Sequence, residues 1–172
     1  MNSELSIIRL FFRDISRELT INQISKELKK SYAYTNKEVR KLLSENILNK
    51  KIIGPSIVCS LNLQSDKTIL LLSYISAEEK EGFGLQNKAV LQKLEDIARK
   101  LASQAAVYSA FFAKKRQNSL TLVCEDEMKV RGLVSSMTGI KFEVVPRSGF
   151  TRPEEEIIIV HGFESFWRLA NA

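Results

Sequence analysis

Three basic side chains in the segment NKEVRKLL are the clearest candidates for binding chemistry in this chain. Lys37, Arg40 and Lys41 are separated by three and four residues, so they share one face of an α-helix. Lysine and arginine neutralise phosphates and release counterions, and arginine can also hydrogen-bond guanine through two N–H groups. The pattern therefore indicates contact with a polyanion, with an ordinary solvated helix face as the alternative.

A helix that presents these cations needs an apolar face to hold it in place. Val39, Leu42 and Leu43 have the spacing of that face. Thr35 and Glu38 have the spacing of a capping box, which predicts that the helix begins at Thr35.

Further polar residues surround the basic helix face. Asn36 can hydrogen-bond adenine through its side-chain amide. The two tyrosines of SYAY are expected just before the helix, where phenolic hydroxyls reach phosphates. Two lysines follow at the expected base of a hairpin. The predicted DNA-binding set is Tyr32, Tyr34, Asn36, Lys37, Arg40, Lys41, Lys50 and Lys51.

The elements around the basic helix follow a recognisable order. Two helices are expected before it, one over Ser3 to Arg17 and one that begins at Thr20. The β-branched runs KIIG and SIVCSLNL flank Gly54-Pro55 and predict a β-hairpin. Three helices followed by a hairpin is the order of a winged helix, whose second and third helices form a helix-turn-helix.

The sequence YTNKEVRKLLSENILNKKIIGPS, followed by SLNL, resembles the winged-helix domains of archaeal and bacterial transcription regulators. The resemblance extends over about Leu5 to Leu63. It implies that double-stranded DNA is the partner of this domain. Winged helices also serve as protein-interaction modules, which is the alternative.

The distribution of charge agrees with a polyanionic partner for the first domain. The chain carries a formal net charge of +6. Residues 1–65 hold 11 Lys and Arg against 6 Asp and Glu, whereas residues 66–172 hold 15 against 14. The basic excess therefore lies in the N-terminal third.

Cysteine usage and hydropathy predict a cytoplasmic protein. Cys59 and Cys124 are isolated from each other in apolar runs, and His161 is the only histidine. This pattern favours a reducing compartment and argues against a structural zinc site. The longest uncharged apolar run, ASQAAVYSAFFA, is too short to span a bilayer, so no membrane partner is expected.

The second half of the chain predicts a small α/β domain. Residues 66–87, with a charge run and two glycines, are interpreted as a hinge, although TILLLSYI within them also fits a helix or a strand. Residues 88–172 predict the order helix, strand, strand, helix, strand, helix, with the last helix ending near Leu169. The expected fold class is α+β, with a winged helix over 1–65 and an α/β domain over 88–172.

The segment FFAKKRQNSLTLVCE and the ending HGFESFWRL resemble the minimal nucleotidyltransferase domain common in archaea, over about Lys88 to Ala170. The family's Gly-Ser pair falls on Ala110 and Phe111, while its following aromatic, Ala and basic residue are Phe112, Ala113 and Lys114. An unrelated α/β domain with a similar element order is the alternative.

The metal ligands of that family are missing from this sequence. The resemblance implies an Asp-x-Asp pair where Ser119 and Thr121 stand, and leaves Glu143 as the one acid at a ligand position. Hydroxyls do not replace carboxylates as Mg²⁺ ligands. The sequence therefore predicts no metal, no cofactor and no catalysis.

The second domain contains two further clusters of charged residues, one basic and one acidic. Lys114, Lys115 and Arg116 fall in a predicted turn, where phosphate binding competes with simple solvation. The acids Glu125 to Glu127 are expected to favour a helix N-terminus.

The leading hypothesis is a DNA-binding transcription regulator whose second domain serves sensing, dimerisation or partner binding. A homodimer or a protein partner is expected at that domain. The alternative is a nucleotidyltransferase-type enzyme, or the accessory subunit of one in a toxin–antitoxin-like pair, with the winged helix as a docking module.

Overall fold

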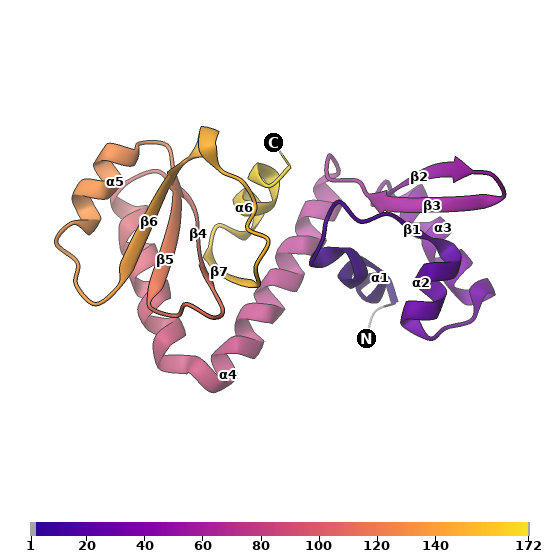
Figure 1. Cartoon of the computed structure of the whole chain (residues 1–172), viewed down its shortest axis with the longest axis horizontal. Coiled ribbons are helices and arrows are strands. Elements are labelled where there is room, and N and C mark those ends of the chain that lie inside the picture. The colour runs from indigo at the N-terminus through magenta and orange to yellow at the C-terminus, as the bar shows by residue number, and fades with distance from the viewer. Residues whose placement is uncertain (1–2, 172) are drawn as a thin grey trace. The chain divides into compact units, whose positions relative to one another are not determined.

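The computed structural model describes residues 3–171 and is mixed α+β, as the sequence predicts. The chain divides into two compact units between Ile75 and Ser76. Helices and strands occur in both units (Figure 1). Among the described helices, none has the length and apolar character required to cross a bilayer.

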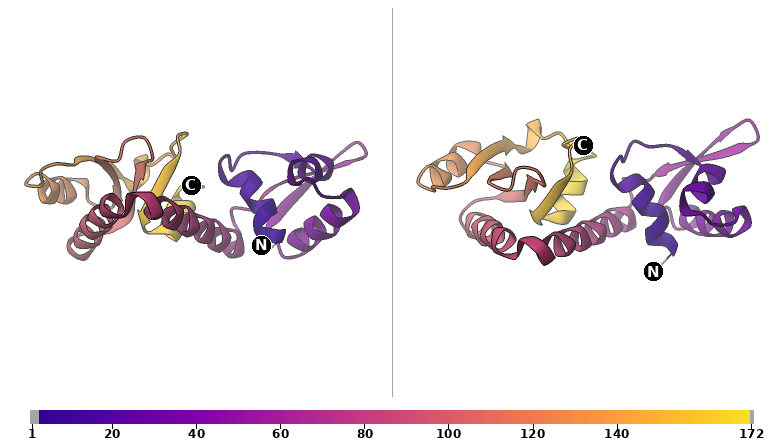
Figure 2. Two further views of the ribbon diagram at one scale, coloured as in Figure 1. Left: turned by 90° about the horizontal axis from the view of Figure 1, so that it is seen from below. Right: turned by 60° about the horizontal axis from the view of Figure 1, so that its bottom comes forward.

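The first unit combines three short helices with a small antiparallel sheet. The helices are α1 (Ser3–Phe12), α2 (Ile21–Leu28) and α3 (Tyr32–Ser44). The strands are β1 (Leu19–Thr20), β2 (Leu48–Ile53) and β3 (Ser56–Leu61), in the order β1-β3-β2. Strand β1 is an addition to the predicted elements, and α1 ends earlier than expected. The hairpin of β2 and β3 projects beyond the helices of its unit (Figure 2).

Helix α3 begins three residues before the predicted position. Ser31 is its N-cap and accepts a hydrogen bond from the Tyr34 backbone N–H at 3.3 Å. Thr35 is buried inside the helix, and Glu38 accepts a hydrogen bond from the Ser3 hydroxyl. The predicted capping box at Thr35 is therefore wrong, because Ser31 offers a hydroxyl one turn earlier.

The capping box of this unit lies at α2. The Thr20 hydroxyl accepts from the Gln23 backbone N–H at 3.2 Å, and the Gln23 side chain accepts from the Thr20 N–H at 2.7 Å. Helix α2 ends where Lys29 adopts a left-handed conformation with φ of 53°. The chain then turns directly into Ser31, which explains the early start of α3.

Two of the three residues predicted for the apolar face of the basic helix are confirmed in the core. Val39 and Leu42 are fully buried, together with Phe11 of α1, whereas Leu43 is half-buried. The hairpin contributes Cys59 to the same unit's buried set. Burial raises the pKa of the Cys59 thiol to about 11, so this cysteine is a neutral apolar side chain at physiological pH.

The predicted hinge is helical. Residues 66–87 form the first part of α4 (Asp66–Gln104), which also contains the helix expected from Lys88. Asn87 alone departs from helical geometry, with φ of −129° and ψ of 36°. Its side-chain N–H donates to the Phe83 carbonyl at 3.2 Å. Good helix formers around Gly82 and Gly84 offset the cost of the two glycines.

The second unit is built on a four-stranded sheet in the order β6-β5-β4-β7. Its strands are β4 (Val107–Ala113), β5 (Ser119–Cys124), β6 (Lys141–Pro146) and β7 (Ile157–His161). Helix α5 (Glu127–Val134) connects the parallel pair β5 and β6, and the other pairs are antiparallel. A 3₁₀ turn, η1 (Arg147–Gly149), follows β6.

The C-terminal segment differs from its prediction. The sequence predicts one short helix here, but the run IIIVH forms β7 and only residues after Gly162 form α6 (Phe163–Leu169). The helix ends at Leu169 as predicted. Three consecutive isoleucines followed by valine favour a buried strand over a helix.

Different elements pack against the two faces of this sheet. One face packs against α4 and α5 through Leu94, Leu101 and Val130. The other face carries Phe111, whose ring makes edge-to-face contacts with Phe150 and Phe166 at centroid distances of 6.1 and 5.3 Å. That aromatic cluster covers part of the second face.

Candidate nucleic-acid interface

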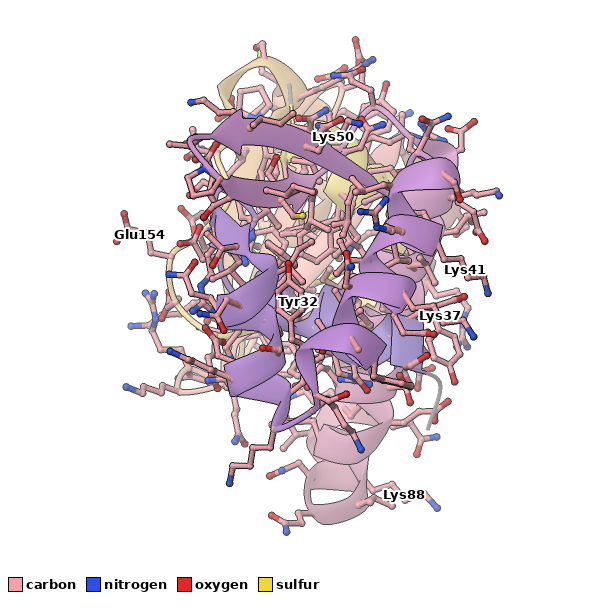
Figure 3. The ribbon with its side chains drawn as sticks, turned by 90° about the vertical axis from the view of Figure 1, so that its right-hand side faces the viewer. Tyr32, Lys37, Lys41, Lys50, Lys88 and Glu154 are labelled. Carbon is pink, nitrogen blue, oxygen red and sulfur yellow. The ribbon has the colours of Figure 1, made fainter. Side chains whose placement is uncertain are left out.

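The exposed side of α3 carries the predicted basic residues. Thr35, Val39 and Leu42 fix the helix through its buried side, so Lys37 and Arg40 are left exposed on the other. Figure 3 shows Lys37 and Lys41 projecting from the same side of α3, with Lys50 on the hairpin. The three predicted cations of the helix are not equivalent, however.

Arg40 is associated with Asn36. Its Nε–H donates to the Asn36 side-chain oxygen at 3.1 Å. This hydrogen bond occupies the Asn36 amide oxygen, which would otherwise accept from adenine. It also orients the Arg40 guanidinium along the row of side chains Tyr32, Asn36 and Arg40, which are spaced four residues apart on α3. The pair therefore presents N–H donors, which suit phosphate oxygens and guanine acceptors.

Lys41 is tied to α1. Its ammonium donates to the Glu4 carboxylate, and this hydrogen bond raises the pKa of Lys41 above its usual value. The positive charge is thus already compensated by a neighbouring carboxylate. The structure separates Lys41 from Lys37 and Arg40 as a weaker candidate for phosphate contact.

The two tyrosines lie inside the helix rather than before it. Tyr32 is the first residue of α3, and its side chain is 54% exposed. Tyr34 is 44% exposed. The first turn of a helix carries free backbone N–H groups and a partial positive charge. Both phenols therefore project from a helix end that favours phosphate.

The hairpin adds one cation to each of its faces. Lys50 and Lys51 lie in the middle of β2, not at its base, and pair with Cys59 and Val58 of β3. Successive residues of a strand point to opposite faces. Both lysines are exposed, on the outer strand of the sheet.

Both acids of this region have partners on other elements. Between Leu28 and Ser65 the sequence contains only two acids. Glu38 accepts from Ser3 of α1, and Glu45 lies 3.5 Å from the ammonium of Lys67 on α4. The same stretch contains seven cations: Lys29, Lys30, Lys37, Arg40, Lys41, Lys50 and Lys51. The excess of cations is visible in the sequence, whereas the partners of the two acids are given only by the fold.

The predicted phosphate-binding turn of the second unit is largely neutralised. The Lys114 ammonium lies 3.0 Å from Glu79 and 3.5 Å from Glu156. Arg116 forms an ion pair with Glu155. Lys115 is exposed. The turn between β4 and β5 therefore offers little net positive charge.

The residues aligned with the nucleotidyltransferase metal site come together on the partly open face of the sheet. The strand register places Ser119 beside Lys141 and Thr121 beside Glu143. The Thr121 hydroxyl donates to the Glu143 carboxylate at 3.1 Å. All four line a cavity of about 600 Å³. Lys141 is absent from the predicted site residues, because its position depends on a parallel strand pairing that no local sequence pattern encodes.

The acidic run at the start of α5 has structural partners. The Asp126 carboxylate accepts from the Lys129 backbone N–H at 2.9 Å and caps the helix, and Glu127 pairs with Arg131. Glu125 accepts from the Tyr108 hydroxyl at 2.6 Å, which raises the pKa of Tyr108. Within residues 3–171, no three His, Cys, Asp or Glu side chains are grouped closely enough to hold a metal ion.

Comparison with known proteins gives no family assignment. No family model matches the chain, and no curated protein or solved structure matches it either.

Proposed function

We propose that the first unit is a winged helix that binds double-stranded DNA and that the chain is a DNA-binding transcription regulator. The observation that carries this proposal is the separation of charge between Leu28 and Ser65. Lys37, Arg40 and the hairpin lysines are exposed, while Glu38 and Glu45 have partners on other elements. Such a surface neutralises phosphates without repelling them.

The proposed binding mode follows from the dimensions of the elements. An α-helix fits the major groove of B-DNA, and α3 is anchored through Val39 and Leu42 with its polar side outward. In a helix-turn-helix the second helix enters the groove while the first crosses the backbone. Here α2 and α3 take these two places, and the hairpin lies beside them.

Duplex binding with strong salt dependence is the expected result of the direct test. The full chain, titrated into a labelled duplex of mixed sequence, should lose affinity steeply as salt rises from 50 to 200 mM, since each phosphate contact releases about one counterion. Fluorescence anisotropy measures the binding constant at each salt concentration. A flat salt dependence, or no binding at 50 mM salt, would contradict the proposal.

For the second unit we propose sensing, dimerisation or partner binding without catalysis. Its resemblance to a minimal nucleotidyltransferase is supported by the joint position of Ser119, Thr121 and Glu143 on one cavity wall. These donors do not fit a magnesium site, because the ion needs several hard anionic oxygens and Glu143 provides the single carboxylate among the three. Although the Lys141 ammonium lines the same cavity, this donor set would not hold the divalent ion that stabilises the charge on a transferred phosphoryl group.

No nucleotidyl transfer is expected from this unit. Incubation with labelled nucleoside triphosphates, Mg²⁺ or Mn²⁺, and protein or RNA acceptors should leave the acceptors unlabelled. The protein itself should also remain unlabelled. Transfer that disappears in Glu143→Ala but persists in Glu155→Ala, a second acid of the same cavity, would establish the alternative enzyme function.

A further inference from the structure

The tip of the β2–β3 hairpin is apolar, although the region around it is basic. Ile52 is 71% exposed and Ile53 is 51% exposed. They immediately follow Lys50 and Lys51 in β2. Two neighbouring large β-branched side chains with this exposure form an apolar patch that the described unit leaves largely uncovered, which indicates a contact with another surface.

The fold does not use these isoleucines in its own core. In the hairpin, Leu48, Cys59 and Leu61 are buried, all in the part of β2 and β3 that lies away from the turn. Ile52 pairs with Ile57 across the strands, and Ile53 pairs with Ser56. Alternation along β2 places one isoleucine on each face, so the tip presents an apolar edge on both sides.

The tip is also narrow and conformationally restricted. Ile53 and Ser56 are paired, so only Gly54 and Pro55 connect the strands. Gly54 has φ of +57°, a left-handed conformation suited to glycine, and the proline ring fixes its own φ. A rigid two-residue turn loses little conformational entropy when it enters a confined site.

The positive charge next to the hairpin tip indicates an anionic partner. No acidic residue occurs between Asn46 and Ser65. The two lysines next to the isoleucines favour anionic groups on the partner, while the isoleucines favour an apolar slot. A DNA duplex has both, because its phosphate strands flank base steps whose stacked faces are apolar. The tip also belongs to the same acid-poor stretch as α3.

We propose that Ile52 and Ile53 form an apolar wedge that enters a base step of the bound duplex and bends it. The proposal rests on the proposed DNA-binding function. With α3 in the major groove, a hairpin that projects beyond the helices reaches across one phosphate strand to the adjacent minor groove. Apolar side chains inserted there unstack the step and kink the duplex toward the major groove.

The test measures DNA bending with the full chain. The probe is a duplex of about 30 base pairs with a central TA step, which is easily kinked, and with a fluorescent dye at each end. The wild-type chain should raise energy transfer between the dyes as it binds. Ile52→Ser combined with Ile53→Ser should abolish that rise and weaken binding by about tenfold, with an unchanged salt slope because no charge is lost.

Two further variants show that the effect belongs to the wedge. Ile52→Leu combined with Ile53→Leu preserves apolar volume and should retain bending. Leu70→Ser removes an apolar side chain of α4 that is 57% exposed and should change neither binding nor bending. Circular dichroism establishes that all variants are folded.

Different outcomes separate the wedge from the proposed function. If the wild-type chain binds without bending the duplex, or the double serine variant bends it equally, the wedge is overturned and DNA binding stands. If the wild-type chain does not bind at all, the proposed function fails first. If the serine variant changes from dimer to monomer in sedimentation and still bends DNA, the tip is a contact between copies and the wedge is overturned.

Discussion

Simultaneous replacement of Lys37 and Arg40 by alanine should weaken duplex binding by about 10- to 100-fold at 0.1 M salt. Both side chains are exposed on α3. Arg40 donates a hydrogen bond to the neutral amide of Asn36, and this bond leaves the positive charge of Arg40 uncompensated. The slope of log affinity against log salt should fall by about two, one for each lost phosphate contact.

The matched control on the same helix is Lys41→Ala combined with Glu4→Gln. Because the Glu4 carboxylate already accepts from the Lys41 ammonium, the combined change removes a pair with no net charge and should change affinity by less than about threefold. Glu4→Gln alone releases the Lys41 charge. It should strengthen binding and raise the salt slope by up to about one.

Fluorescence anisotropy at several salt concentrations distinguishes these variants. Equal losses for the combined Lys41 and Glu4 variant and for Lys37→Ala would mean that the Glu4 pair does not persist on DNA. Unchanged binding by the Lys37 and Arg40 double variant would contradict the assignment of α3 as the recognition helix. Circular dichroism checks that each variant keeps its helices.

The first unit shows which features are local enough to predict. The spacing of Val39 and Leu42 placed the buried side of α3 correctly, and the turn residues Gly54-Pro55 placed the hairpin. The start of α3 was wrong because two hydroxyl residues compete for the cap, and sequence alone does not rank them. Ser31 prevails because α2 has already ended at Lys29.

The neutralisation of individual lysines could not be predicted from the sequence, because each lysine and its acidic partner are distant in the chain. Lys41 and Glu4 are 37 positions apart, and Lys114 and Glu79 are 35 positions apart. The composition located the basic excess in residues 1–65, but only the packing of α1 against α3 reveals which cations are neutralised. Ion pairs between elements follow the tertiary fold, which periodicity does not encode.

The sheet of the second unit illustrates a similar limit. The strands from Val107 to Pro146 were predicted from their β-branched and apolar runs, whereas β7 was merged into the following helix. The signal that separates them is Gly162, where the chain turns from β7 into α6. The pairing of Thr121 with Glu143 depends on strand register, so the sequence could not predict that these residues line one cavity.

Gly162→Ala should be the most destabilising single change considered for this chain, with a loss of about 4 kcal/mol or more in the stability of the second unit. Gly162 has φ of +67°, and a Cβ atom there would lie 1.9 Å from the Tyr108 carbonyl oxygen. The obstacle is the backbone of β4, an interior strand of the sheet. Neither a rotamer change nor a small side-chain shift can relieve such a contact.

Gly54→Ala is the matched control, because it separates backbone strain from steric overlap. Gly54 also has a left-handed φ, of +57°, but no atom lies within 4 Å of the position of its Cβ. Alanine there should cost only about 1–2 kcal/mol, the strain of a left-handed residue. The change also lies in the first unit and should leave the second unit's transition in place.

Urea denaturation with two probes measures each unit. Trp167 is the only tryptophan, and its indole N–H donates to Ser76 at 2.9 Å within the second unit, so its fluorescence follows the unfolding of that unit. Circular dichroism follows the helices of both units. A tryptophan transition of Gly162→Ala within about 1 kcal/mol of the wild type would contradict the close approach of α6 to β4, since a backbone overlap has no cheaper way to relax.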